Sequence, residues 1–170
     1  LGFDGVELFT SSADAVDVQL LQGLVEKYAV HISAVGTGAG KVIHGLTLTD
    51  PDPAIRKKAV EFITNMMRFG AHFQAPAIIG SMQGNAGSDR RASLAHLAEA
   101  LRELGELAIS LGVVLIYEPL NRYETNLFNR LEDAAQFLEM EGISGVGLLA
   151  DLFHMNIEER DLADSIRQQA

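Results

Sequence analysis

The 170-residue chain contains no cysteine. This absence excludes a disulfide framework, thiolate-bound zinc, iron–sulfur clusters and thiol catalysis. Basic residues are also scarce, with 13 Lys and Arg against 23 Asp and Glu, so the formal net charge is −10. The negative charge of the chain would repel the phosphates of a nucleic acid, and the composition therefore argues against a nucleic-acid partner.

Long hydrophobic runs are missing as well. No apolar stretch approaches the roughly 20 residues that a membrane-spanning helix needs, because charged residues interrupt every long one. We therefore expect no membrane segment, and we predict a cytoplasmic protein. Apolar residues nevertheless make up 48% of the chain, enough for the core of one ordinary domain. The opening Leu1–Leu8 already resembles the run-in to a strand, so we expect the chain to begin within a fold.

Apolar runs alternate with longer amphipathic runs along the whole chain, a pattern that predicts βαβ units, a parallel sheet and the α/β class. Nearly continuous apolar runs, typical of strands buried on both faces, predict strands at residues 5–9, 30–35, 75–80, 113–118 and 146–151. Amphipathic runs predict helices at residues 13–28, 53–69, 90–111 and 131–140, and a last one from about residue 161. Asp52 and Ser88 are the expected N-caps of the second and third helices.

Two of the predicted strands end in an acid, Glu118 and Asp151. Ligand sites of parallel α/β folds lie at the carboxyl ends of the strands, and neighbouring strands are about 4.8 Å apart. If these strands are neighbours, the two carboxylates converge and need a cation or a shared proton. A single acid at the end of a strand more often caps the following helix. The pair of acids instead favours a site for Mg²⁺ or Mn²⁺, and an added histidine ligand would favour Mn²⁺ or Co²⁺.

Polar segments begin at both acids, at residues 118–126 and 151–159, and their hydrogen-bonding groups suit a small polyhydroxylated ligand. With the residues just before each acid, they form the stretches 117–126 and 149–159. The two segments resemble the signature loops of the ketose 3-epimerases, which include D-tagatose, D-psicose and L-ribulose 3-epimerases, in the xylose isomerase-like TIM-barrel superfamily. The opening residues 2–8 resemble the second-strand motif of that superfamily. The resemblance implies an incomplete (β/α)₈ TIM barrel, strands 2 to 6 with their helices, as a single partial domain over residues 1–170. A complete barrel takes about 250 residues.

The resemblance also implies roles for individual residues. Glu118 is the implied catalytic acid or base and a metal ligand, and Asp151 is the second ligand, with Mn²⁺ as the first candidate ion and Mg²⁺ or Co²⁺ as alternatives. Glu124 and His154 contact substrate hydroxyls, and Arg122 matches a further family position. The implied reaction removes the proton next to the carbonyl of a ketose through a cis-enediolate. In the family, a histidine of the seventh strand and a glutamate of the last strand complete the metal shell, and that glutamate is the second acid.

Three further features lie near predicted strand ends. Gln83 follows the strand at residues 75–80 and is expected to line the pocket. Glu7 is a candidate for the same pocket, with a structural salt bridge as the equal alternative. The run Gly36-x-Gly38-x-Gly40 lacks both the phosphate-binding pattern and a helix directly behind it, so we expect it to let the backbone approach the substrate or a lid bend.

Alternative functions stay open at this point. Within the superfamily they are hydroxypyruvate isomerase, inosose dehydratase or isomerase, and sugar-phosphate epimerase; the charge of −10 argues against the abasic-site endonucleases. A different class is a non-catalytic half-barrel that serves as a binding or assembly module. The expected partner is a small sugar, and a homo-oligomer, in which another copy closes the barrel, is a further alternative.

Overall fold

The computed structural model describes residues 2–169, which form a five-stranded parallel sheet whose strands follow the order of the chain. The strands are β1 (Gly5–Phe9), β2 (His31–Gly36), β3 (Ala77–Ile79), β4 (Leu115–Tyr117) and β5 (Val146–Leu148). All neighbouring strands are parallel. Each connection therefore returns the chain to the same end of the sheet and contains a helix, as parallel pairing requires. The predicted α/β class is confirmed.

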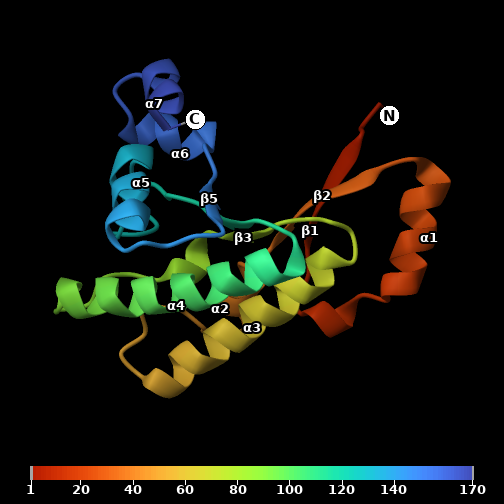
Figure 1. The fold of residues 1–170 in the computed structure, drawn as a ribbon, viewed down its shortest axis with the longest axis horizontal. Helices are drawn as coiled ribbons and strands as arrows, with labels where there is room; N and C mark the ends of the chain where they lie inside the picture. Colours follow the sequence, from red (N-terminus) through yellow and green to blue (C-terminus); the bar gives the residue numbers. More distant parts are fainter. Residues whose placement is uncertain (1, 170) are drawn as a thin grey trace.

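Seven α-helices and two 3₁₀ turns accompany these strands within the described residues, and the last two helices follow β5. These elements are η1 (Ala13–Ala15), α1 (Val18–Tyr28), α2 (Ala39–His44), α3 (Pro53–Ala71), η2 (Ser81–Gln83), α4 (Arg90–Leu111), α5 (Leu131–Met140), α6 (Leu152–Glu158) and α7 (Leu162–Gln169). Figure 1 shows α3 and α4 side by side, with α1 at one end of the molecule and α5, α6 and α7 gathered at the other. None of these helices is both long and apolar enough to cross a membrane.

The sheet is open. Its outer strands β1 and β5 do not pair with each other within residues 2–169. A closed barrel leaves no such edge, so five strands in sequential parallel order confirm the prediction of an incomplete (β/α)₈ barrel.

The main core lies between the second half of the sheet and the helices α3, α4 and α5. In α4 the buried side chains Leu97, Leu101, Leu104 and Ala108 recur every three or four residues and cover β3 and β4, as an amphipathic helix on a sheet should. Gly105, on the same face, lets α4 approach the segment before β5. A Cβ there would lie only 2.1 Å from the carbonyl oxygen of Ser144. This contact positions β5 beside β4.

The first predicted helix is interrupted in the structure. Instead of one helix over residues 13–28 there is the 3₁₀ turn η1, and α1 begins only at Val18. Asp17 is the reason: its backbone is extended, and its carboxylate accepts the N–H groups of Gln19 and Leu20. Such a side chain caps a new helix rather than continuing an old one.

Two other local predictions were wrong. The N-cap of α4 is Asp89, whose carboxylate accepts the N–H of Ala92, and not Ser88. A short helix, α2, begins within the glycine run, with Gly38 as its N-cap and Gly40 in its first turn. The sequence contained no capping side chain at that point, and Gly38 provides none, so the usual start signal is missing.

Candidate active site

The two acids lie at the carboxyl ends of β4 and β5, which are neighbouring strands. The last paired residues are Tyr117 and Leu148, so Glu118 directly follows its strand while Asp151 lies three residues beyond its own. The predicted strands at residues 113–118 and 146–151 were therefore too long. Asp151 ends the extended segment because its carboxylate accepts the N–H of Phe153, at 2.7 Å, and caps α6.

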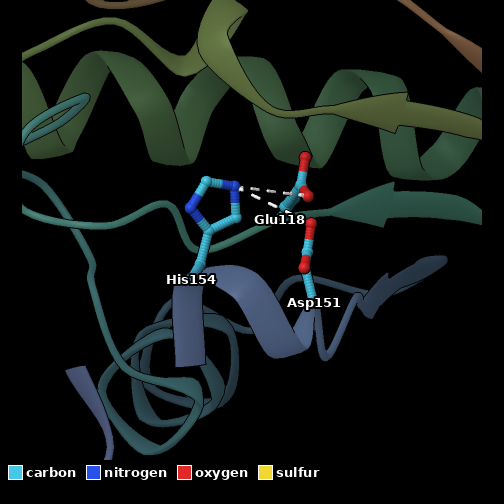
Figure 2. A group of neighbouring side chains, drawn as sticks. All are labelled: Glu118, Asp151 and His154. Atoms are coloured by element: carbon cyan, nitrogen blue, oxygen red, sulfur yellow. Dashed lines mark ion pairs between the residues drawn. The ribbon is translucent and has the colours of Figure 1, made fainter. Parts of the chain in front are cut away.

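Three side chains meet at this edge of the sheet. One ligand atom from each of Glu118, Asp151 and His154 lies within 4.8 Å of the others. The Nε2 atom of His154 is 3.8 Å from Oε1 of Glu118 and 3.9 Å from Oδ2 of Asp151 (Figure 2). The expected convergence of the two carboxylates is therefore present, and Asp151 both caps α6 and faces Glu118.

Negative charge is concentrated around Glu118. Burial raises the pKa of its carboxyl from 4.5 to about 7, and the neighbouring carboxylate of Asp151 is the next cause, followed by Glu7 and Glu124. Carboxylates this close need a proton or a cation between them. Two neighbouring carboxylates, one directly after β4 and one at the N-cap of α6, offer oxygen donors that fit a divalent cation of the Mg²⁺ or Mn²⁺ kind.

The hydrogen bonds of His154 indicate how its ring is protonated. Its Nδ1 accepts the backbone N–H of Asn121 at 3.2 Å and lies 2.8 Å from the side-chain nitrogen of the same residue. Because a backbone amide only donates, Nδ1 is the acceptor, and in the neutral ring Nε2 carries the proton. The ring is buried, with 7% of the residue exposed. His154 thus offers an N–H donor to the site, which suits a substrate oxygen better than a metal ion.

Glu124 lies beside this histidine. Its Oε1 accepts a hydrogen bond of 2.8 Å from the amide of Asn121 and is 3.7 Å from Nδ1 of His154. The carboxylate is 44% exposed, so it remains free to accept hydrogen bonds from a ligand. Asn121, which links the two predicted substrate contacts, was missed because nothing distinguishes it from other loop asparagines in sequence.

Gln83, the residue expected to line the pocket, makes its hydrogen bonds within the protein. It is fully buried, and its amide donates to the carbonyl oxygens of Gly80 and Glu118, both at 3.0 Å, while accepting the hydroxyl of Tyr117. Protein groups thus occupy the polar atoms of this side chain, and Gln83 supports the backbone of Glu118 through its hydrogen bond to that carbonyl. Its contact with a substrate stays a prediction.

Gly80 is a second support that the sequence analysis missed. A Cβ at this position would lie 2.6 Å from Oε2 of Glu118. Any side chain would displace the carboxylate, so the glycine leaves room for it above β3. A glycine at the end of a buried strand was the available signal.

The structure also shows which groups surround Arg122 and Glu7, the two remaining residues predicted near the site. Arg122 pairs with Glu158, through Nε at 2.9 Å and a terminal nitrogen at 2.8 Å, instead of pointing a free guanidinium at the acids. Glu7 contributes to the raised pKa of Glu118, which places it at the same end of the sheet. Among the described residues it has no ion-pair partner within 4.0 Å, so the alternative of a structural salt bridge is not realised there.

The open parallel sheet with its outer helices defines a (β/α)-barrel protein, and the acids lie at the carboxyl edge of the sheet, where proteins of this architecture bind their ligands. A model of the xylose isomerase-like TIM barrel family matches residues 1–170. The chain belongs to this family.

Individual relatives are named epimerases. A D-psicose 3-epimerase from Enterocloster bolteae is 31% identical over 99% of this chain and 58% of its own length. A 3-dehydro-D-guloside 4-epimerase from Escherichia coli is 37% identical over 41% of this chain and 27% of its own length. The solved structure of an L-ribulose 3-epimerase has a TM-score of 0.84 at 26% identity, over 99% of this chain and 57% of the other. The chain thus spans less than two thirds of the relatives that match nearly all of it.

Proposed function

We propose that this chain carries the metal and proton-transfer half of a ketose 3-epimerase site. The observation that carries the proposal is the convergence of Glu118, Asp151 and His154, with the pKa of Glu118 raised to about 7. A general base or acid works best when its pKa is near the working pH. The named activities of the relatives support the same reaction class.

Glu118 and Asp151 are the residues that would hold a divalent cation, with Mn²⁺ as the first candidate and Mg²⁺ or Co²⁺ as alternatives. When bound, such an ion supplies Lewis-acid polarisation of the carbonyl oxygen of a ketose. Asp151 keeps one oxygen for this purpose, since its Oδ1 atom caps α6.

The proton transfer belongs to Glu118. Its carboxylate removes the proton from C3, the electron pair of that C–H bond forms the C2–C3 double bond, and the carbonyl oxygen takes up the negative charge of a cis-enediolate. The N–H of His154 and the carboxylate of Glu124 would hold the sugar hydroxyls during this step. Return of a proton from the opposite face inverts C3, and we assign that role to a second acid on the last strand of a complete barrel.

Hydrogen exchange at C3 tests this assignment directly, because it requires only one base. In D₂O with Mn²⁺, the chain should introduce deuterium at C3 of D-psicose or L-ribulose, observed by NMR. Glu118→Gln should abolish the exchange, and Glu106→Gln, which removes an exposed acid of α4, should leave it unchanged. Equal exchange by the native chain and Glu118→Gln would refute the role of Glu118.

A second candidate is proton transfer at C4 of a 3-keto glycoside, supported by the local 37% identity with the 3-dehydro-D-guloside 4-epimerase. The chemistry at Glu118 would be the same, because C4 adjoins the carbonyl of such a substrate. Deuterium at C4 of a 3-keto glycoside, with none at C3 of free ketoses, would favour this reaction. A chain that neither exchanges these protons nor takes up Mn²⁺ would instead support a non-catalytic half-barrel module.

A further inference from the structure

Two adjacent glutamates at the end of α6, Glu158 and Glu159, have almost fully covered side chains, although neither residue belongs to the acid cluster of the site. Only 6% of the side chain of Glu158 and 1% of that of Glu159 is exposed. A buried carboxylate is costly unless charged and hydrogen-bonding partners surround it. Their partners are therefore informative.

Glu158 joins α6 to the segment that follows Glu118. Its Oε1 accepts the backbone N–H of Arg122 at 2.7 Å and the guanidinium Nε at 2.9 Å, and its Oε2 accepts a terminal guanidinium nitrogen at 2.8 Å. The hydrogen bonds from Arg122 lower the pKa of Glu158. Because the planar guanidinium binds both carboxylate oxygens, the pair fixes the distance and the angle between Glu158 and the segment that carries Arg122.

Glu159 joins the same end of α6 to the start of α5. Its carboxylate accepts the N–H of Leu131 at 2.9 Å, Nε of Arg130 at 3.1 Å and the hydroxyl of Ser165 at 3.0 Å. Leu131 is the first residue of α5, and the N-cap Arg130 makes no capping bond of its own. Glu159 therefore takes the place of the N-cap side chain, where a negative charge is favourable.

Together the two carboxylates fasten α6 to both ends of residues 122–131. This segment follows Glu118 and contains Glu124, whereas α6 has Asp151 as its N-cap and contains His154. The two halves of the site therefore lie on separate pieces of chain that these contacts hold together. We propose that Glu158 and Glu159 are positioning residues, which set α6 at the spacing from residues 118–124 that brings Asp151 and His154 to Glu118.

The ion pair between Arg102 and Glu141 provides a matched control. It also joins two separate elements, α4 and the end of α5, but its side chains are 45% and 40% exposed, and neither residue belongs to the site. Exposed pairs of this kind contribute little to stability. Glu141→Gln therefore removes a charge of the same type without loosening α6.

Amide hydrogen exchange tests the proposal without depending on activity. The N–H of Asn121 donates to His154 on α6, and the N–H of Glu118 donates to Ile79 on β3. In Glu158→Gln, and in Glu159→Gln, we expect exchange at Asn121 to accelerate about tenfold while exchange at Glu118 stays unchanged. Arg122→Lys keeps the positive charge but loses the paired guanidinium hydrogen bonds, so it should accelerate exchange at Asn121 less than Glu158→Gln does. Glu141→Gln should not accelerate this exchange at all. Unchanged exchange at Asn121, or equal acceleration at both amides, would overturn the proposal.

The consequence for the site rests on the proposed function and is measured separately. Titration with Mn²⁺ should give a half-saturation concentration about tenfold higher in Glu158→Gln than in the native chain, the loss typical of residues that hold metal ligands in place. If the native chain takes up no Mn²⁺, the proposed function fails, while the exchange experiment still decides whether the two glutamates position α6.

Discussion

At the scale of single residues, Glu118 is the acid to which we assign the proton transfer. It lies at the end of β4, above the open space that Gly80 leaves, and three other acids face it. Its raised pKa results mainly from burial, so its ionisation is linked to the folding equilibrium.

The stability of the chain should therefore depend on pH through the ionisation of Glu118. The folded chain binds the Glu118 proton more tightly than the unfolded chain, because the pKa is about 7 rather than 4.5. The resulting stabilisation is fully present below pH 4.5 and is lost as the pH rises through 7. With a chelator present, we expect the difference in Tm between native chain and Glu118→Gln to change across this interval, measured by thermal melts. Parallel pH profiles for the two proteins would contradict this prediction.

At the scale of elements, α6 shows how one residue serves folding and chemistry together. Asp151 caps the helix with Oδ1, and its Oδ2 lies toward His154 and Glu118. The helix cap predicted from sequence is therefore present, and the same side chain keeps an oxygen toward the acid cluster, where its role as a metal ligand stays a prediction.

Two substitutions at Asp151 should separate these roles. Asparagine is as good an N-cap as aspartate, so Asp151→Asn should keep the free energy of unfolding nearly native while Mn²⁺ uptake is lost with the negative charge. Asp151→Ala should lose uptake and also about 1 kcal/mol of stability, the usual contribution of a cap. Urea unfolding and Mn²⁺ titration of both variants give the comparison. Equal stability of the two variants would show that the cap contributes nothing.

The contact between α4 and the segment before β5 supports a second prediction at this scale. Gly105→Ala places a Cβ 2.1 Å from the carbonyl oxygen of Ser144 and should lower stability by about 1–3 kcal/mol, the range for overpacking. Gly23→Ala, in α1, meets no atom within 4 Å and should raise stability by about 0.4–1 kcal/mol. Urea unfolding measures both. A native-like Gly105→Ala would mean that α4 does not depend on this close approach.

At the scale of the whole molecule, the strand order brings the site together. Sequential parallel pairing makes β4 and β5 neighbours and aligns Tyr117 with Leu148. Glu118 and Asp151 then approach each other from segments that are about one βα unit apart in sequence. The same open sheet leaves β1 and β5 with one partner each among residues 2–169, which fits a chain spanning 58% of a D-psicose 3-epimerase.

Much of this arrangement follows from the sequence alone. The apolar runs predicted five strands in order, and the amphipathic period predicted α4 over residues 90–111 and α5 over residues 131–140 with the bounds observed. Acids at two strand ends predicted the cluster. These features are local, because the burial of a strand, the period of a helix and the residue that ends an element are all encoded within a few neighbouring positions.

Only the tertiary structure decided where the side chains between these elements point. Gln83 donates to the carbonyl of Glu118, Arg122 pairs with Glu158, and Glu159 caps the start of α5 instead of the residue that precedes it. These contacts join residues 28 to 36 positions apart, so they depend on strand register and helix packing rather than on any short pattern. The sequence by itself determined which residues are candidates for the chemistry, and the contacts of α6 with residues 122–131 decided how these candidates face one another.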